Sequence, residues 1–213
     1  MLSFNSNLNY SMTSNPYEEA TSLAIDGHNL IVTGQAGTGK SFLLTQIADQ
    51  LTKNGKTVQK AASTGLAASI IAEDTGACTL HNFCGLKIGN LSDDQLKNVA
   101  SQNDVSIRLR STDCLLIDEI SMVSDDIIRQ ANIVLCEARQ CSRPFGGMQV
   151  ILFGDFYQLP PVKSAHIFNW NYFDAAVPHR INLTRNYRCD YLKKLEKLHV
   201  IFVTMFLDKM KKD

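Results

Sequence analysis

Residues 34–41 read GQAGTGKS, and their types and spacing are those of a loop that holds the phosphates of a nucleotide. Gly37 and Gly39 let backbone N–H groups approach phosphate oxygens closely, and the start of a following helix adds its dipole. Lys40 is suited to neutralise phosphate charge, and the hydroxyl of Ser41 to bind Mg²⁺. The predicted cofactor-binding residues for ATP, all in this loop, are Gly34, Gln35, Ala36, Gly37, Thr38, Gly39, Lys40 and Ser41.

A pair of acidic residues follows the apolar run CLLI at residues 114–117. Such a run is typical of a buried strand, so Asp118 and Glu119 fall at its carboxyl end. Asp118, together with Ser41, is the predicted Mg²⁺ ligand set. Glu119 is placed to orient or deprotonate an attacking water, a role that separates NTP hydrolases from nucleotide kinases. The pair therefore predicts hydrolysis of ATP.

A third polar segment, GDFYQLPPV at residues 154–162, also follows an apolar run. It carries Asp155 and Gln158 next to a rigid Leu-Pro-Pro stretch. A glutamine at this place in a P-loop ATPase can read the γ-phosphate and relay its presence to a neighbouring surface. By spacing alone, an ordinary polar loop is the favoured interpretation.

Alternating strands and helices must position these segments, which predicts an α/β fold with a mostly parallel sheet flanked by helices. In such sheets, ligands bind at the carboxyl ends of the strands, where all three segments fall. The expected strands, each rich in apolar residues, are 28–34, 57–62, 114–119, 148–154 and 179–183. The expected helices are 17–26, 40–53, 65–74 and 124–138.

Composition describes an ordinary globular chain of 213 residues with a formal net charge of +0. There is no overall basic field to draw the chain onto nucleic acid, so any DNA contact must be local. The polar N-terminal residues show no secretory or mitochondrial import pattern, and the longest C-terminal apolar run is too short to span a bilayer. We therefore expect an intracellular protein without a membrane partner.

The six cysteines show no paired C-x-x-C spacing, which is typical of a reducing compartment. Cys78, His81 and Cys84 could supply three metal ligands, but no fourth ligand stands at a suitable spacing. We therefore favour free thiols there over a zinc site.

Taken together, six blocks of the sequence resemble superfamily-one DNA helicases, specifically the PIF-type family of five-prime to three-prime helicases. The blocks occur in the family's order over about residues 27–190 and are GQAGTGKS, ASTGLAA, TLHNFCGL, LLIDEISM, FGDFYQLPPV and LTRNYR. The resemblance implies a RecA-like ATPase domain, ATP and Mg²⁺ as cofactors, and single-stranded DNA as partner. It also implies work in DNA repair, recombination or genome maintenance, and a nuclear location in a eukaryote.

The resemblance also assigns roles that the residues alone do not. It implies that single-stranded DNA runs along Ser63, Thr64, Gly65, Thr79, His81 and Phe83, with the Phe83 ring able to stack on a base. Without it, His81 and Phe83 would be interpreted as core residues. It further implies that Arg188 points at the γ-phosphate, so the expected catalytic set is Lys40, Glu119, Gln158 and Arg188.

Two departures from the family pattern matter. Ungapped alignment puts Tyr17 where the family has a glutamine that reads adenine, which leaves adenine selectivity open. The sequence also ends soon after Arg188, where the family continues into a second RecA-like domain. We expect a disordered tail at 1–16, the ATPase domain at 17–190, and a helix or tail at 191–213. A second motor domain, or a full-length relative acting in trans, is therefore an expected partner for unwinding.

Two other functions remain open. A non-catalytic remnant that binds nucleotide or DNA and regulates a full-length relative is the first, although an intact Glu119 argues against a decayed site. An oligomeric P-loop loader or remodeller is the second, and the ASTGLAA and LPPV segments disfavour it.

Overall fold

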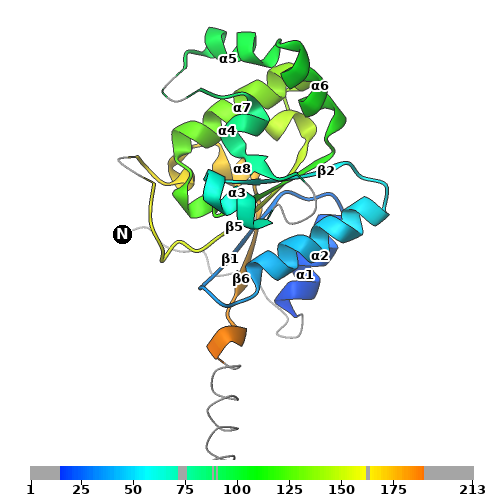
Figure 1. The fold of residues 1–213 in the computed structure, drawn as a ribbon, viewed down its shortest axis with the longest axis vertical. Coiled ribbons are helices and arrows are strands. Elements are labelled where there is room, and N and C mark those ends of the chain that lie inside the picture. Colours follow the sequence, from blue (N-terminus) through cyan, green and yellow to red (C-terminus); the bar gives the residue numbers. More distant parts are fainter. Residues whose placement is uncertain (1–14, 72–75, 88, 90, 162–163, 190–213) are drawn as a thin grey trace, which may run out of the picture.

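A single sheet of six parallel strands organises the protein (Figure 1). The computed structural model describes residues 15–71, 76–87, 89, 91–161 and 164–189. The strand order is β3-β2-β4-β5-β1-β6. The strand bounds are β1 Leu30–Gly34, β2 Val58–Ala62, β3 Cys78–Thr79, β4 Cys114–Asp118, β5 Gln149–Gly154 and β6 His179–Leu183. This architecture confirms the predicted α/β fold with a RecA-like parallel sheet.

The pairing register brings the carboxyl ends of the strands to one edge of the sheet. Ala62 pairs with both Thr79 and Asp118, while Thr33 pairs with Gly154 and Gly34 with Leu183. The segments that follow these residues therefore leave the sheet side by side, although they are far apart in sequence. This edge is where parallel α/β sheets bind ligands.

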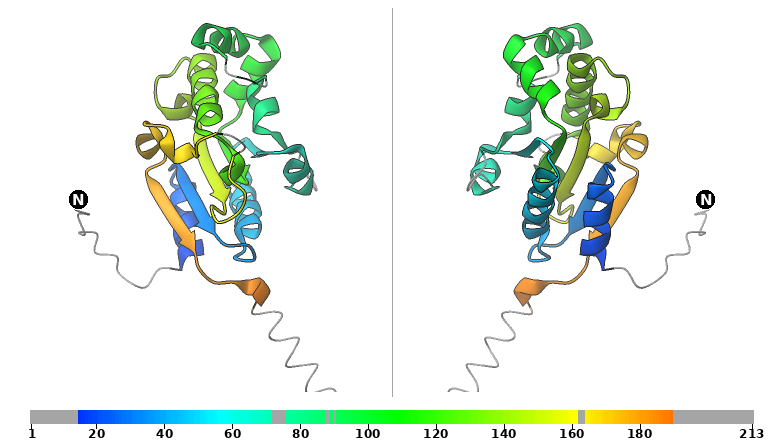
Figure 2. Two further views of the ribbon diagram at one scale, coloured as in Figure 1. Left: turned by 90° about the vertical axis from the view of Figure 1, so that its left-hand side faces the viewer. Right: turned by 90° about the vertical axis from the view of Figure 1, so that its right-hand side faces the viewer.

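Two helices, α1 Pro16–Ile25 and α2 Lys40–Lys53, cover one face of the sheet (Figure 2). The apolar residues of α2 recur at helical spacing, and Leu43, Leu44, Ile47 and Leu51 are buried against the strands. Alternate strand residues, such as Leu116 and Phe153, face this layer. The predicted helix at 40–53 is confirmed, and the helix expected at 17–26 begins one residue earlier, inside the expected tail.

A larger group of helices covers the opposite face. Its central member is α7 Asp125–Arg139, which contacts α4 Leu80–Cys84, α5 Asp93–Ala100 and α6 Asn103–Ser111. The remaining elements are α3 Gly65–Ile71, α8 Phe173–Ala176, and the 3-10 helices η1 Ile120–Met122, η2 Pro144–Gly147 and η3 Ile167–Asn169. The sequence patterns predicted α3 and α7 but not α4, α5, α6, α8 or strand β3, all of which are short. The last three residues of the helix expected at 65–74 lie outside the described part of the chain.

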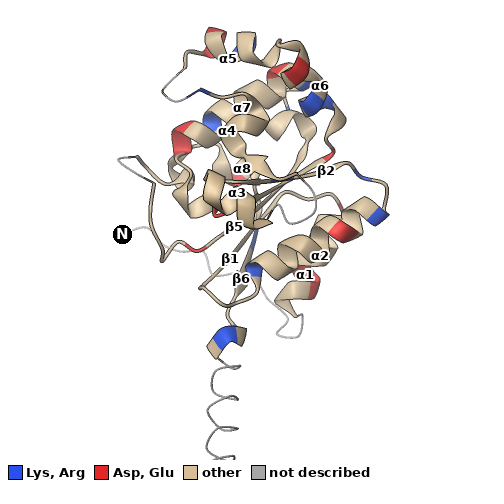
Figure 3. Cartoon of the chain, in the orientation of Figure 1, with Lys and Arg blue, Asp and Glu red and all other residues tan. Residues whose placement is uncertain are grey.

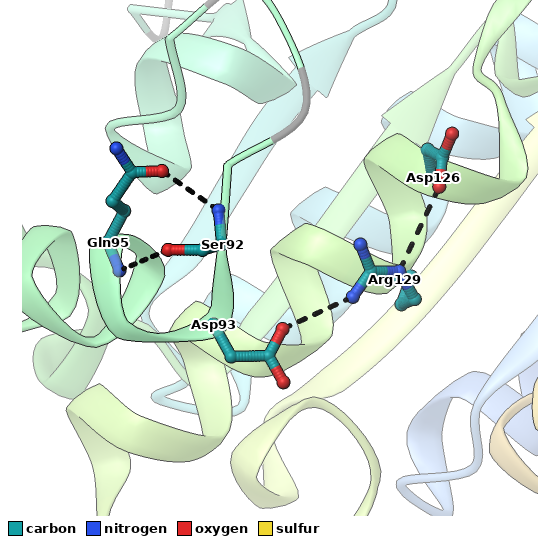
Figure 4. A network of polar contacts seen from close by, with 5 residues as sticks. All are labelled: Ser92, Asp93, Gln95, Asp126 and Arg129. Atoms are coloured by element: carbon teal, nitrogen blue, oxygen red, sulfur yellow. Dashed lines mark hydrogen bonds and ion pairs between the residues drawn. The ribbon is translucent and has the colours of Figure 1, made fainter.

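Helix α5 shows how such a short element forms (Figure 4). The Ser92 hydroxyl accepts a hydrogen bond from the Gln95 N–H, and the Gln95 side chain accepts one from the Ser92 N–H, which together cap the helix start. Asp93 then reaches Arg129 of α7, with 3.5 Å between the oxygen and nitrogen. Because this ion pair is exposed, it contributes at most about 1 kcal/mol, and burial of Leu96 and Val99 is the larger stabilising term.

Charged residues of both signs are mixed over the described elements in the view of Figure 3. None of the described helices is both long and apolar enough to cross a membrane. The tail expected at 191–213, and all but the last two residues of the one expected at 1–16, lie outside the described residues.

Candidate active site

The GQAGTGKS loop connects β1 to α2, as its pattern predicts. Gly37 and Gly39 have φ values of +85° and +82°, a left-handed conformation that glycine adopts at little cost. Gly37 also has no room for a side chain, because a Cβ atom there would come within 2.6 Å of the Asn186 side-chain oxygen. Gly39 caps α2 without a side-chain hydrogen bond, so the first N–H groups of the helix stay available to an anion.

Thr38 and Lys40 hold the loop in a tight turn. Thr38 is 1% exposed, and its hydroxyl donates a 2.8 Å hydrogen bond to the Gln35 carbonyl oxygen. The Lys40 ammonium donates to the carbonyl oxygens of Gly34, at 2.6 Å, and Gln35, at 3.1 Å. These carbonyls keep the ammonium inside the loop, where it can exchange them for phosphate oxygens.

Ser41 and Asp118 come together across the sheet edge from different elements. The Ser41 hydroxyl at the start of α2 lies 3.5 Å from Oδ2 of Asp118 at the end of β4. Asp118 is only 5% exposed, and burial raises the pKa of its carboxyl above the ordinary value. A hydroxyl and a carboxylate facing each other are hard oxygen donors of the kind Mg²⁺ takes alongside nucleotide phosphates, so the residues present fit that ion.

Glu119 turns the chain sharply out of β4 and into η1. Its φ of +53° and ψ of +41° are left-handed, an uncommon conformation for a residue with a side chain and one that stores local strain. Burial, followed by the neighbouring charge of Asp118, raises the pKa of the Glu119 carboxyl, and the Asp155 charge adds to the shift. A raised pKa brings a carboxylate closer to the range that suits a general base.

Gln158 is positioned by Asp155. Asp155, directly after β5, is 3% exposed, and its Oδ2 accepts a 2.8 Å hydrogen bond from the Gln158 carboxamide. Its other oxygen accepts from the Tyr157 N–H at 3.1 Å. The buried carboxylate of Asp155 therefore holds the glutamine, while Leu159 of the adjoining Leu-Pro-Pro stretch is 71% exposed.

The segment after β6 packs onto the phosphate loop. The Asn186 carboxamide donates to the Ala36 carbonyl oxygen at 3.0 Å, and the Tyr187 and Arg188 N–H groups point at the Gly37 carbonyl oxygen at 2.9 and 3.4 Å. Arg188 is exposed, and its Cβ atom lies beside Gly37 of the loop. Asn186 was not predicted, and its position inside the LTRNYR block is the only sequence signal that could have singled it out.

The residues expected on a DNA path lie at the ends of β2 and β3. Ser63, Thr64 and Gly65 follow β2, and Thr79 ends β3 beside them. The Thr64 hydroxyl accepts a hydrogen bond from the Ala67 N–H at the start of α3. The Thr79 hydroxyl likewise accepts from the Asn82 N–H at the start of α4. These residues therefore form a continuous strip along the sheet edge.

His81 and Phe83 diverge on α4. His81 is half-buried, and burial lowers the pKa of its imidazole below the ordinary value. Phe83 is 0% exposed and belongs to the core beneath α5, α6 and α7, which contradicts the expectation that its ring stacks on a base. The reason is helical geometry, because residues two positions apart in a helix point to different sides. Phe83 therefore points into the core when His81 does not.

The described residues contain no group of three or more His, Cys, Asp or Glu side chains that could hold a metal ion by themselves. The zinc interpretation of Cys78, His81 and Cys84 gains no support, since Cys84 is fully buried and burial raises its pKa to about 12.

A hollow of about 810 Å³ lies between α1 and α2 next to the phosphate loop. Its apolar lining includes Phe42, Ile25 and the rings of Tyr17 and Tyr187, and Gly39 closes its loop end. The Tyr17 hydroxyl donates to the Thr38 carbonyl oxygen, and the two tyrosine rings meet edge to face at 5.9 Å between centroids. Aromatic side chains beside a phosphate loop offer a surface on which a flat ring can stack.

A parallel six-stranded sheet with a phosphate loop after β1 and buried acidic residues after β4 and β5 defines a P-loop NTPase of the RecA-like class. The family model described as PIF1-like helicase matches residues 16–207. The chain belongs to the PIF1-like helicase family.

The similarity extends to individual proteins and structures. The ATP-dependent DNA helicase RRM3 of Saccharomyces cerevisiae is 39% identical over 183 residues, which cover 81% of this chain and 25% of RRM3. The crystal structure of Pif1 helicase from Candida albicans superposes with a TM-score of 0.75 and 37% identity over 83% of this chain and 41% of that one. The crystal structure of Pif1 helicase from Bacteroides in complex with ADP-AlF3 and ssDNA superposes with a TM-score of 0.69 and 31% identity. The match covers 82% of this chain and 42% of that one. The chain thus spans about a quarter of RRM3.

Proposed function

We propose that this chain provides the ATP-hydrolysing first motor domain of a PIF-type DNA helicase that moves five-prime to three-prime in DNA repair, recombination or genome maintenance. The observation that carries the proposal is the meeting of four segments at one sheet edge. The phosphate loop, the ends of β4 and β5, and the segment after β6 all converge there. The proposal implies an intracellular site of action, which is the nucleus in a eukaryote.

ATP binds with its phosphates on the loop 34–41 in this proposal. The backbone N–H groups at the start of α2 and the Lys40 ammonium, released from its two carbonyl partners, bind the phosphate oxygens. Ser41 and Asp118 would hold Mg²⁺, which would supply positive charge beside the phosphates. The base enters the hollow between α1 and α2, against the ring of Tyr17.

Hydrolysis depends on Glu119 and on two groups that contact the γ-phosphate. Glu119 accepts the proton of the attacking water, and its raised pKa favours that transfer. Gln158 is held by Asp155 within the same strand-end cluster, where it orients the water or the γ-phosphate. Arg188 approaches over Gly37 and stabilises the charge that develops on the phosphate oxygens.

Single-stranded DNA follows the strip at the ends of β2 and β3, where Ser63, Thr64, Gly65, Thr79 and His81 lie. The strip shares its sheet edge with the nucleotide site, because Ala62 of β2 pairs with Asp118 of β4. A movement of the DNA-binding strip can therefore displace the nucleotide site, and the reverse, through the paired strands β2 and β4. This is the physical basis for stimulation of ATP turnover by DNA.

Unwinding needs two domains that open and close on ATP. The described residues hold one such domain, so we propose that a second motor domain, on the same polypeptide or in trans, completes the motor. In a strand-displacement assay the purified 213-residue chain is expected to leave a tailed duplex intact. ATP-dependent unwinding by this chain alone would contradict the two-domain requirement.

ATP turnover by the purified chain, with and without single-stranded DNA, tests the function. Lys40→Ala should abolish nucleotide binding, and Glu119→Gln should keep binding but slow turnover by about a hundredfold to ten-thousandfold. Lys53→Ala at the far end of α2 and Glu137→Gln on α7 are matched controls that should leave turnover unchanged.

The motor domain and the regulatory remnant predict different results in this assay. DNA-stimulated turnover that Lys40→Ala and Glu119→Gln both abolish supports the motor domain. Nucleotide binding that Lys40→Ala removes, without turnover in the parent chain, would favour a regulatory remnant instead.

A further inference from the structure

The C-terminal end of α7 brings two cysteines together. Gln140 follows the helix with a left-handed φ of +51°. The Gln140 N–H donates a 3.2 Å hydrogen bond to the Glu137 carbonyl oxygen, and the Cys141 N–H donates one of 3.1 Å to the Cys136 carbonyl oxygen. These two hydrogen bonds define a Schellman motif. In this motif, the side chains of the two residues joined by the hydrogen bond that spans more of the sequence pack against each other. In this chain both of those residues are cysteines.

Arg143 holds both sulfur atoms. Its Nε donates to the Cys141 sulfur at 3.5 Å, and its carbonyl oxygen accepts a 3.3 Å hydrogen bond from the Cys136 thiol. The guanidinium packs over Gly147, where a Cβ atom would come within 2.7 Å of its Nη2. The pair is therefore fixed by one arginine whose position depends on a glycine.

The pair is open to solvent through a hollow of about 340 Å³. Both cysteines line it and are partly exposed, whereas Cys84 and Cys114 are buried. The hydrogen bond from Arg143 lowers the pKa of the Cys141 thiol, and burial raises that of Cys136. The two sulfurs are thus suited to different roles, Cys141 as the attacking thiolate and Cys136 as the thiol that follows.

We propose that Cys136 and Cys141 are an oxidation site at which a peroxide converts the two thiols into an intramolecular disulfide. The Cys141 thiolate attacks one peroxide oxygen, the O–O bond breaks, and hydroxide leaves, which gives a sulfenic acid on Cys141. The Cys136 sulfur then loses its proton and attacks the Cys141 sulfur. The S–S bond forms, the S–O bond breaks, and water leaves. Overall, two thiols are oxidised by two electrons and one peroxide is reduced to two waters.

The site is independent of the proposed ATPase. The loop 140–148 leads into the amino end of β5, whereas the phosphate loop follows the carboxyl end of the parallel strand β1. Cys141→Ser is therefore expected to leave ATP turnover unchanged, so loss of the oxidation site and loss of hydrolysis can be told apart.

Peptide mapping of the full chain after treatment with hydrogen peroxide tests the proposal. Trypsin cuts after Arg139, between the two cysteines, so a disulfide keeps the two peptides joined until a reductant is added. We expect the joined pair in the parent chain and in Cys189→Ser, a control that removes an exposed cysteine elsewhere. Cys136→Ser should instead leave a sulfenic acid on Cys141 that dimedone traps, and Arg143→Gln should slow formation of the joined pair.

Three outcomes would overturn the proposal. These are separate peptides with both thiols still free, a disulfide from Cys141 to a second copy of the chain, or equal trapping of Cys141 sulfenic acid in the parent chain and in Cys136→Ser.

Discussion

The carboxamide of Asn186 donates a 3.0 Å hydrogen bond to the carbonyl oxygen of Ala36, which fastens the segment after β6 to the phosphate loop 150 residues earlier in the chain. The Asn186 side-chain oxygen at the same time accepts from the Cys189 N–H at 3.0 Å. One side chain therefore sets both the shape of the loop and the start of the segment that carries Arg188. The proposed arginine contact to the γ-phosphate depends on this link.

Asn186→Ala is expected to raise KM for ATP about fivefold, because the loss of a hydrogen bond worth about 1 kcal/mol loosens the phosphate loop. Arg188→Ala is expected to lower kcat instead, since its side chain acts on the transition state. Steady-state ATP turnover separates the two effects. Asn98→Ala, on the exposed side of α5, is the control. A KM that is unchanged in Asn186→Ala would show that the link does not shape the loop.

Asp118→Asn is expected to stabilise the nucleotide-free protein at pH 7 while it abolishes Mg²⁺-dependent turnover. Burial raises the pKa of Asp118 in the folded state, so the folded protein binds the Asp118 proton more tightly than the unfolded chain does. The stabilisation that this proton gives is fully present below the ordinary pKa and is lost as pH rises through the raised pKa. Removal of the charge should raise the thermal midpoint at pH 7 and flatten its dependence on pH. Thermal unfolding from mildly acidic to neutral pH measures this.

Asp49→Asn, on the exposed side of α2, should leave the midpoint of that unfolding curve where it is. A lower midpoint in Asp118→Asn than in the parent chain would mean that the charged carboxylate stabilises the fold.

Phe83→Ala is expected to destabilise the protein by about 3–5 kcal/mol, because it leaves a cavity beneath α4. Phe83→Leu keeps most of the volume, so it should fold and bind single-stranded DNA as the parent chain does. His81→Ala changes a half-buried side chain of α4 and should weaken the binding of single-stranded DNA. Denaturant unfolding and fluorescence anisotropy with a labelled oligonucleotide test these variants. Weak DNA binding by a stably folded Phe83→Leu would restore the stacking role.

Tyr17→Gln is expected to increase the preference for ATP over GTP. The Tyr17 hydroxyl already donates to the Thr38 carbonyl oxygen, and burial raises its pKa to about 12, so it stays protonated and committed to the loop. A carboxamide can both donate to and accept from the edge of adenine. The ratio of kcat/KM for the two nucleotides measures the change, and Tyr17→Phe controls for loss of the loop hydrogen bond. An unchanged ratio in Tyr17→Gln would place the base away from residue 17.

The sequence by itself determined the phosphate loop, the acidic strand ends and five of the six strands. These features are local, because a glycine-rich turn between a strand and a helix, or a carboxylate after an apolar run, needs only its neighbours in the chain to be identified. The helix at 40–53 was predicted with its observed bounds for the same reason. Short elements such as β3 and α4 carry too few residues to show a period.

Only the tertiary structure decided which of two plausible environments each ambiguous side chain occupies. Phe83 is suited equally to a core and to a base stack, and the packing of α4 against α6 and α7 buries it. Asn186, in the segment after β6, reaches Ala36 of the phosphate loop through a hydrogen bond that depends on where β1 and β6 end in space. Such contacts join residues whose distance along the chain carries no information about their distance in the fold, so no local pattern predicts them.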